Sequence, residues 1–337
     1  MKVKIGELTK IKTGKLDANA ASEDGQYPFF TCSKEPLRIS TYSYDCECVL
    51  VAGNGDLNVK YYNGKFDAYQ RTYIIEDNGS GKLYMPYLYY FMEGYIEELR
   101  KQAIGGVIKY IKLGNLTNAL IELPSIDEQK SIVEILVKAK GILEKRNDEL
   151  NALDDLIKAR FVEMFGDCGN MVSLNDLCLI ITDGTHQPPK FQETGIPFIL
   201  VSNLSNNTVT YNTVKYVSEE TYDELYKRTP IELGDLLLST VGSYGHPAVV
   251  TEDIRFLFQR HIAYLKPKRE LVNSFYLHSA LLASDGQRQI EEKVKGIAQK
   301  TLNLSEIRKI MIPFPKLEEQ NAFAAFVHHV DKSKLKE

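Results

Sequence analysis

The sequence has no tryptophan, no long apolar run and only five cysteines among its 337 residues. No window reaches the roughly 18 apolar residues that a membrane-spanning helix needs, and the basic N-terminal segment is not followed by the apolar core of a signal peptide. The cysteines are odd in number and lack paired C-x-x-C spacing, so they predict neither a disulfide framework nor a zinc site. We therefore expect a cytoplasmic protein with no membrane partner.

Metal-ligand spacing is absent from the histidines as well. The six histidines form no ligand pattern, and His328 and His329 are adjacent, so they cannot share one helix face. We therefore expect no metal site in this chain.

The chain also lacks a strong excess of either charge. Its net charge is −4, with 15 basic and 15 acidic residues in 1–123, and 15 and 16 in 170–313. Most of the acidity lies in 124–169, which carries 7 basic and 10 acidic residues. The charge balance by itself argues mildly against a nucleic-acid partner, although a neutral globular part can still present a local basic face.

What the sequence contains is the material for two globular domains and a repeat. Hydrophobic residues make up 44% of the chain and aromatic residues 10%, enough for ordinary cores. The stretch "LPSIDEQ" returns 191 residues later as "FPKLEEQ". The same offset aligns Gly105 with Gly296, Lys109 with Lys300, Leu113 with Leu304, Leu116 with Ile307 and Ile121 with Ile312. An internal duplication with diverged detail is indicated.

Two further matches extend the repeat toward the N-terminus. The pair Gln70-Arg71 aligns with Gln259-Arg260 at an offset of 189, and "VKIGELTKIKTG" resembles "VSLNDLCLIITDG". Because Gln-Arg occurs in both halves, it is typical of phosphate contact or scaffold hydrogen bonding more than of base choice.

Each half is predicted to mix strands and helices. Content of β-branched and aromatic residues predicts strands at Cys48–Ala52, Arg71–Ile75, Phe198–Ser202, Asp235–Thr240 and His261–Lys266. Helices are expected at Pro86–Arg100 and Leu271–Val294.

A long helix is predicted between the halves, over Ile126–Phe165. Apolar residues recur at sevenfold spacing at Leu136, Leu143, Leu150, Ile157 and Met164, which is typical of a coiled-coil seam. One helix of this length cannot bury its stripe alone. Each "Pro-x-x-x-Glu-Gln" reads as a helix start, because proline has no N–H to lose there and acidic side chains suit the first turn.

These segments resemble a known family, the DNA specificity subunits of type I restriction-modification systems. The central conserved region of that family is similar to "LPSIDEQKSIVEILVKAKGILEKRNDELNALDDLIKARFVEMFGD", and its distal counterpart is similar to "IPFPKLEEQNAFAAFVHHVDKSK". The stretch "ITDGTHQPPKFQETGIPFILVSNL" looks like a recurrent opening of the family's target recognition domains.

The resemblance implies an α+β fold with two mixed α/β target recognition domains in tandem repeat, separated by long antiparallel coiled-coil-like helices. The implied limits are 1–123 for the first domain, 124–166 for the central helical region, 167–313 for the second domain and 314–337 for the distal helix. The family's distal helix is usually about as long as the central one, whereas this sequence stops some twenty residues after Pro315.

The resemblance also implies a reader without chemistry of its own. Each domain is expected to read one half of a bipartite, asymmetric site in double-stranded DNA. Two methyltransferase subunits are expected to dock on the helical regions, and restriction subunits to join them. The S-adenosylmethionine, ATP and Mg that the reactions need are expected in those partner subunits, and none in this chain.

The residues themselves favour a reader over an enzyme. The glycine pair in Val51–Gly55 is not followed by a helical pattern, as a cofactor loop would be, and Gln187–Lys190 lacks the aromatic that would stack on a flipped base. Asp285 with Glu291 and Lys293 is typical of a solvated helix face. Two alternatives stay open: a two-lobed interaction adaptor that does not bind DNA, and a self-contained DNA-modifying enzyme.

Candidates for DNA contact are the polar, basic and aromatic residues of the expected loops. In the first half they are Lys12, Lys15, Ser33, Lys34, Arg38, Asn54, Lys60, Tyr61, Tyr62, Lys65, Gln70, Arg71 and Lys109. In the second half they are Thr185, His186, Gln187, Lys190, Ser243, Tyr244, His246, Gln259, Arg260 and Lys300.

Overall fold

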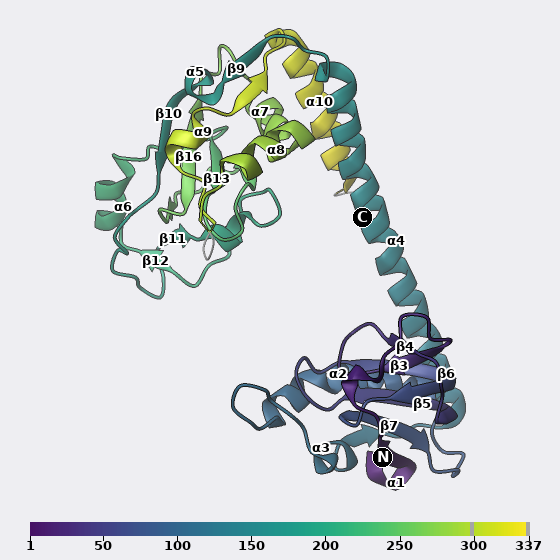
Figure 1. The fold of residues 1–337 in the computed structure, drawn as a ribbon. Helices are drawn as coiled ribbons and strands as arrows, with labels where there is room; N and C mark the ends of the chain where they lie inside the picture. The colour runs from purple at the N-terminus through teal and green to yellow at the C-terminus, as the bar shows by residue number, and fades with distance from the viewer. Residues whose placement is uncertain (297–299, 335–337) are drawn as a thin grey trace. The chain divides into compact units, whose positions relative to one another are not determined.

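The computed structural model describes residues 1–296 and 300–334 of the chain. The chain divides into two compact units, unit 1 from Met1 to Lys145 and unit 2 from Arg146 to Glu337. Each unit combines β-sheets with helices packed on them (Figure 1). The predicted α+β class with tandem mixed domains is confirmed.

Unit 1 is built on a six-stranded sheet in the order β2-β7-β5-β6-β3-β4, with a separate pair β1-β8. The strands are β1 Lys2–Lys4, β2 Thr9–Thr13, β3 Tyr27–Phe30, β4 Leu37–Ile39, β5 Tyr44–Ala52, β6 Val59–Ala68, β7 Thr72–Asp77 and β8 Leu120–Glu122. The helices are α1 Ile5–Leu8, the 3-10 turn η1 Ala18–Ala20, α2 Met85–Gln102, α3 Leu113–Thr117 and the 40-residue α4 Ile126–Phe165.

The core of unit 1 lies between this sheet and α2. Apolar residues recur along α2 at the three- and four-residue spacing of one helix face, and that face is buried. Leu88 and Met92 are inaccessible to solvent and pack in one cluster with Val49, Val51 and Ile75 of the central strands. The helix predicted at Pro86–Arg100 is confirmed, as are the strand centres on β5 and β7.

Unit 2 repeats the plan, with its strands divided among three sheets. Its sheets have the orders β10-β16-β13-β14, β12-β11-β15 and β17-β9. The strands are β9 Met171–Ser173, β10 Cys178–Asp183, β11 Ile196–Ile199, β12 Tyr216–Val217, β13 Leu236–Ser239, β14 Pro247–Val249, β15 Leu257–Phe258, β16 Ile262–Pro267 and β17 Met311–Pro313. The helices are α5 Leu174–Leu177, the 3-10 turn η2 Val201–Leu204, α6 Glu219–Tyr226, α7 Ser274–Leu282, α8 Ser284–Lys293, α9 Leu304–Ile307 and α10 Leu317–Lys334.

Two predictions in the second half are wrong in detail. The single helix expected over Leu271–Val294 is two helices, α7 and α8, because Ala283 is extended at ψ 155° and the chain turns there. Gly286 then lies so close to the carbonyl oxygen of Ala280 that a Cβ would approach it to 2.3 Å. The strand expected to reach Ser202 ends at Ile199, where η2 follows.

Equivalent strand registers confirm the duplication. In unit 1, Val49 pairs with Ile75 on neighbouring antiparallel strands, and in unit 2 Leu236 pairs with Leu265 in the same way. The pair β1-β8 corresponds to β9-β17, since both join the start of a unit to the segment that precedes its Pro-x-x-x-Glu-Gln motif.

The glutamine of that motif ties each unit to the helix that follows. Gln129 has no exposed surface, and its amide accepts a hydrogen bond from the Tyr84 N–H at 2.8 Å while donating to the carbonyl oxygens of Lys82 and Pro124 at 2.9 and 3.0 Å. Lys82 and Tyr84 form the entry to α2. One side chain therefore bonds the start of α4 to the start of α2.

Gln320 makes the same three bonds in unit 2. Its amide accepts from the Asn273 N–H at 3.0 Å and donates to the carbonyl oxygens of Leu271 and Pro315 at 3.2 and 3.0 Å. It too is fully buried, and its partners form the entry to α7. We call this arrangement the glutamine clasp.

The glutamate of the motif has a separate task at the surface. Glu128 accepts hydrogen bonds from the backbone N–H and the hydroxyl of Ser125, at 2.8 and 2.7 Å, and these bonds lower the pKa of its carboxyl group. Glu319 accepts from the Lys316 N–H at 3.0 Å. Each glutamate thus caps the helix start in the manner of a capping box.

Within unit 2, α10 runs antiparallel to the C-terminal part of α4 (Figure 1). Phe161 packs edge-on against Phe323, with ring centroids 5.5 Å apart, and the Lys334 ammonium lies 2.6 Å from the Asp154 carboxylate near the other end of the contact. The predicted antiparallel helix pair is therefore present. Residues 335–337 of the predicted distal region lie outside the described residues.

Farther toward its N-terminus, in unit 1, α4 leaves much of its apolar stripe exposed. Leu143 is 66% exposed and Ile142 68%, although Leu143 belongs to the predicted sevenfold seam. The predicted helix limits at Ile126 and Phe165 are confirmed. The seam in this stretch is an accessible apolar surface of unit 1.

The clasp predicts a defined loss of stability. Replacing Gln129 by Met keeps the side-chain volume but leaves a buried N–H and two carbonyl groups without a partner. The free energy of unfolding of unit 1 should therefore fall by about 2 to 5 kcal/mol. The control is Lys130→Met on the exposed neighbouring position. Urea titration combined with hydrogen exchange at the Tyr84 amide measures the effect, and equal stability of the two variants would show that the clasp contributes nothing.

Candidate nucleic-acid interface

In unit 1 four loop segments meet beside the first residues of β7. A short bridge joins Leu16 to Tyr69, and the Gln70 N–H donates to the Leu16 carbonyl at 2.9 Å. The Gly53 N–H donates to the Arg71 carbonyl at 2.8 Å. The segments are 14–16, 53–55, 69–71 and the hairpin 103–110, and together we call them loop edge 1.

The hairpin joins this edge through backbone bonds. Asn54 pairs with Tyr110, and the Gly55 N–H donates to the Lys109 carbonyl at 3.0 Å. Because the bonds are between backbone groups, the edge can carry different side chains without losing its shape.

Unit 2 assembles the equivalent edge. Thr185 is bridged to Gln259, the Arg260 N–H donates to the Thr185 carbonyl at 3.1 Å, and Val241 pairs with Thr301. Loop edge 2 consists of 184–186, 240–242, 259–261 and the described residues of 295–301. Arg260, Thr240 and Thr301 line a hollow of about 500 Å³ there.

Gly14 and Gly184 each pass so close to a neighbouring backbone segment that only glycine fits there. A Cβ on Gly14 would lie 2.1 Å from the carbonyl oxygen of Ala68, and a Cβ on Gly184 would lie 2.2 Å from that of Phe258. Such distances are far inside van der Waals contact. The "TG" and "DG" at the ends of β2 and β10 are therefore geometrical requirements of the edge.

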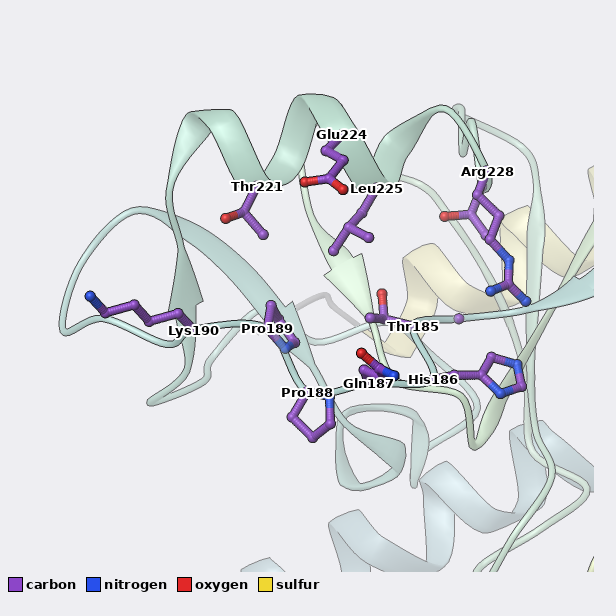
Figure 2. A pocket seen from close by; sticks show the side chains of 12 residues that line it. Thr185, His186, Gln187, Pro188, Pro189, Lys190, Thr221, Glu224, Leu225 and Arg228 are labelled. Carbon is purple, nitrogen blue, oxygen red and sulfur yellow. The ribbon is translucent and has the colours of Figure 1, made fainter.

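A second concavity of about 510 Å³ lies beside loop edge 2, between the loop Gly184–Lys190 and helix α6 (Figure 2). The carboxylate of Asp183, which is half-buried, binds the ring Nε2 of His186 at 2.8 Å and the guanidinium of Arg228 at 2.9 Å. Figure 2 shows Lys190 at the opposite end of the cleft. The cleft thus has the Asp183 ion pairs at one end and Lys190 at the other.

Three polar side chains form a cluster at loop edge 2, on which Lys300 lies next to Thr301. Lys300 donates to the Glu291 carboxylate at 2.9 Å and to the Tyr244 hydroxyl at 3.2 Å, and Tyr244 donates to Glu291 as well. The hydrogen bonds from Tyr244 and Lys300 lower the pKa of Glu291 below its usual range. Lys300 and Tyr244 are thus already engaged with one another.

Some candidates of the first half reach loop edge 1 and others do not. Lys15, Asn54, Gln70, Arg71 and Lys109 lie on it. Next to it, the Cys32 thiol contacts the Arg71 carbonyl at 3.7 Å. Ser33 accepts a hydrogen bond from the Thr31 hydroxyl, and Lys34 lines a hollow with Arg100 of α2.

The remaining first-half candidates have partners within the unit. Lys12 forms an ion pair with Glu76, Arg38 donates to the Gly25 carbonyl, Lys60 bonds Asn58, Tyr61 donates to Glu47, Tyr62 donates to the Lys65 carbonyl, and the Lys65 ammonium lies over the Tyr42 ring. Burial lowers the pKa of Lys60, which lies on strand β6.

Second-half candidates divide in the same way. Thr185, Gln259, Arg260 and Lys300 lie on loop edge 2, and His186, Gln187 and Lys190 line the cleft. Ser243 is exposed in the neighbouring turn. His246 is half-buried, and its Nδ1 lies 2.9 Å from the Asn207 side-chain oxygen. The role of each candidate in DNA contact stays a prediction.

The structure shifts the equivalence of the two Gln-Arg pairs by one residue relative to the sequence alignment. Hydrogen bonding across the turns makes Tyr69 equivalent to Gln259, since the Thr72 N–H donates to Tyr69 and the Ile262 N–H donates to Gln259. Gln70 therefore corresponds to Arg260. The two pairs match in residue type, but the position of each turn is set by the hydrogen bonds to the strand that follows it.

Arg228 and the apolar residues Val107 and Ile108 were missed by the sequence reasoning. Arg228 follows α6 and meets Asp183 only through tertiary folding, 45 residues apart, so no local spacing announces it. Val107 and Ile108 occupy the tip of the hairpin, and their apolar character argued for burial. A signal was present in the glycine pair Gly105-Gly106, which marks a turn.

Metal-ligating side chains and the glycine-rich segment Val51–Gly55 were the two features weighed as cofactor sites. Across 1–296 and 300–334, no three His, Cys, Asp or Glu side chains converge as a metal site. The segment Val51–Gly55 leads from β5 into β6, an antiparallel neighbour, and not into a helix. All five cysteines are free thiols, and burial raises the pKa of Cys178 to about 12.

Comparison with known proteins finds one matching family model and several similar proteins. The family model described as type I restriction modification DNA specificity domain matches residues 1–152 and again residues 170–337. The type I restriction enzyme EcoDI specificity subunit of Escherichia coli is 42% identical over 156 residues, 46% of this chain and 34% of that subunit. The EcoBI specificity subunit of Escherichia coli is 23% identical over 82% of this chain and 65% of its own length.

The matches thus span about a third and about two thirds of these two relatives. Among solved structures, the type I restriction-modification S subunit from M. genitalium has a TM-score of 0.60 at 16% identity, covering 99% of this chain and 90% of that one. A chain from a study of complex assembly and conformational transition of the type I R-M system has a TM-score of 0.52 at 17% identity. These structural matches support the fold alone.

The close backbone approach at Gly184 predicts that Gly184→Ala disturbs loop edge 2. The new methyl group would collide with backbone, so unit 2 should lose about 1 to 3 kcal/mol and the Thr185 amide should exchange faster. Gly169→Ala is the matched control, because a Cβ there meets no atom within 4 Å. Glycine would not be needed at this position if both variants showed the parent's exchange at Thr185.

Proposed function

This chain belongs to the family of type I restriction modification DNA specificity domains, and we propose that it is the DNA-reading subunit of a type I restriction-modification complex. The observation that carries the proposal is the loop edge built twice by equivalent backbone bonds and furnished with different side chains. Two loop edges with the same backbone and different side chains suit a bipartite, asymmetric site, because each edge can present its own set of base contacts.

The side chains on the two edges have the chemistry that duplex DNA requires. Lys15, Arg71 and Lys109 on loop edge 1 offer cations to phosphates, and Asn54 and Gln70 offer paired donors and acceptors to base edges. On loop edge 2, Arg260 and Gln259 supply the same two kinds of group, with Lys190 at the adjoining cleft. We assign base reading to the amides and to Thr185, and backbone positioning to the cations.

We further propose that methyltransferase subunits dock on α4. In unit 1 the helix exposes a band of apolar side chains that its own unit leaves uncovered: Ile132, Ile135, Leu136, Val137, Ile142 and Leu143. An apolar band of this kind on a polar helix is typical of a protein contact surface. Two methyltransferase subunits and the restriction subunits complete the proposed complex.

Chemistry in this proposal belongs to those partners, which would hold S-adenosylmethionine, ATP and Mg. The support is that Val51–Gly55 joins antiparallel strands and that the polar residues near Glu291 are bonded to one another. None of the helices within 1–296 and 300–334 combines the length and apolar character needed to cross a membrane. We propose a cytoplasmic location because the DNA partner is there.

A domain exchange tests the proposal. Replacing residues 170–313 by the equivalent domain of another specificity subunit should change one half of the methylated site and leave the other half unchanged. The donor should keep an aromatic residue at Tyr276, because this ring packs 5.0 Å from Phe165 of α4. Methylome sequencing of cells carrying the complete system gives the readout.

The matched exchange replaces residues 1–123 and should change the complementary half-site. If either exchange altered both halves in a complex that still assembled, the two units would not read independently. A complex that methylated no defined site with the parent chain would contradict the proposed function itself.

Helix length gives a separate prediction about the unread gap between half-sites. One heptad inserted after Lys140 keeps the seam on one face and adds about 10 Å to α4. The gap should then grow by up to about three base pairs at about 3.4 Å each, with reduced activity because the readers also rotate about the duplex.

The insertion point avoids the part of α4 held by α10, where Asp154 meets Lys334. The control replaces residues 134–140 by an unrelated helical heptad of the same length. Methylation retained at the parent spacing in the longer variant would leave the sevenfold residues with a packing role alone.

A further inference from the structure

The hairpin of loop edge 1 is closed tightly at its base. The Ile104 N–H donates to the Tyr110 carbonyl at 3.0 Å, and the Tyr110 N–H returns a bond to Ile104 at 2.8 Å. Gly105 has φ +120°, and a Cβ there would meet the Ile108 carbonyl oxygen at 2.6 Å. The tip is therefore held in one shape by its backbone, and we call residues 103–110 the tip hairpin.

The tip carries apolar side chains that unit 1 leaves uncovered. Val107 is fully exposed and Ile108 is 63% exposed. In Figure 1 the chain between α2 and α3 extends away from the rest of unit 1. Two neighbouring β-branched residues displayed on a rigid hairpin favour contact with another molecule, because nothing in their own unit gains from their position.

The sequence around the tip hairpin is basic, which favours a negatively charged partner. Between Glu98 and Glu122 the sequence has no acidic residue and four basic ones. Lys109 and Lys112 are exposed, and neither takes part in an ion pair within the described residues. A polyanion therefore fits this surface better than a neutral or basic protein does.

The same device occurs in unit 2. Lys295 and Thr301 close a hairpin with two backbone bonds of 3.0 and 2.8 Å, and Gly296 has φ +106°. Residues 297–299 lie outside the described residues. An element kept in both halves of a protein that reads two different half-sites suits a contact that does not depend on base sequence.

We propose that the tip hairpin enters the minor groove of the DNA duplex as an apolar wedge, with Val107 and Ile108 against the base edges and Lys109 and Lys112 beside the flanking phosphates. The minor groove presents a degenerate pattern of donors and acceptors, which suits side chains without hydrogen-bonding groups. Apolar wedges there partly unstack a base step. The inference rests on the proposed DNA-reading function.

The test uses the chain assembled with its methyltransferase partner and a duplex carrying the recognised site, with 2-aminopurine placed in turn at each step of the site and its flanks. The double variant Val107→Ser with Ile108→Ser should bind at least about tenfold more weakly. The loss should be similar on unrelated duplex, and the fluorescence rise that marks unstacking should disappear. The methylated half-sites should stay the same.

Two variants frame the result. Leu120→Ser on β8 is the control, because Leu120 is 53% exposed and lies outside the tip hairpin. Lys109→Ala should weaken binding to all duplexes and reduce the salt slope by about 0.9.

Three outcomes separate the claims. Unchanged affinity and unstacking in the double variant would overturn the wedge and leave the proposed function intact. Failure of the double variant to assemble with the methyltransferase subunit would identify the tip as a protein contact, which also overturns the wedge. If the parent complex bound no DNA, the proposed function would fail together with the inference.

Discussion

Each half of this protein is tied to its following helix by a buried glutamine amide. Gln129 and Gln320 each satisfy one backbone N–H and two carbonyl groups that lie far from one another in sequence. A buried backbone group without a partner costs about 1 to 3 kcal/mol, so the helix start cannot leave the entry of α2 or α7 without losing several such contributions at once. The sheet, its loop edge and the outgoing helix of each unit are therefore held as one piece.

That rigid piece explains how one plan can present two different surfaces. The registers of β5 with β7 and of β13 with β16 are equivalent, and the loops beside them are joined by backbone hydrogen bonds. Because the backbone supplies these bonds, most side chains on the loops can differ between the halves without a change in the shape of the edge. Some side chains do bond within the unit, as His246 does with Asn207 at 2.9 Å.

Features that repeat locally were predictable from the sequence. The limits of α4, the burial of one face of α2 and the equivalence of Gly105 with Gly296 follow from periodicity, from helix-start residues and from a constant offset. The interruption at Ala283 and the one-residue shift of the Gln-Arg pairs were not predictable in this way. Both depend on which strand or helix the segment packs against, and the spacing of apolar residues does not specify that partner.

The sequence by itself determined the duplicated α+β plan, the central helix and the family to which the chain belongs. Tertiary structure alone decided which polar residues remain available to a partner. Arg228 is bound to Asp183 and Lys300 to Glu291 and Tyr244, while Lys109 stands on an uncovered hairpin, although all are similar surface cations in the sequence. The reason is physical: periodicity is a property of neighbouring residues, whereas hydrogen bonds and ion pairs depend on distances that only the folded chain establishes.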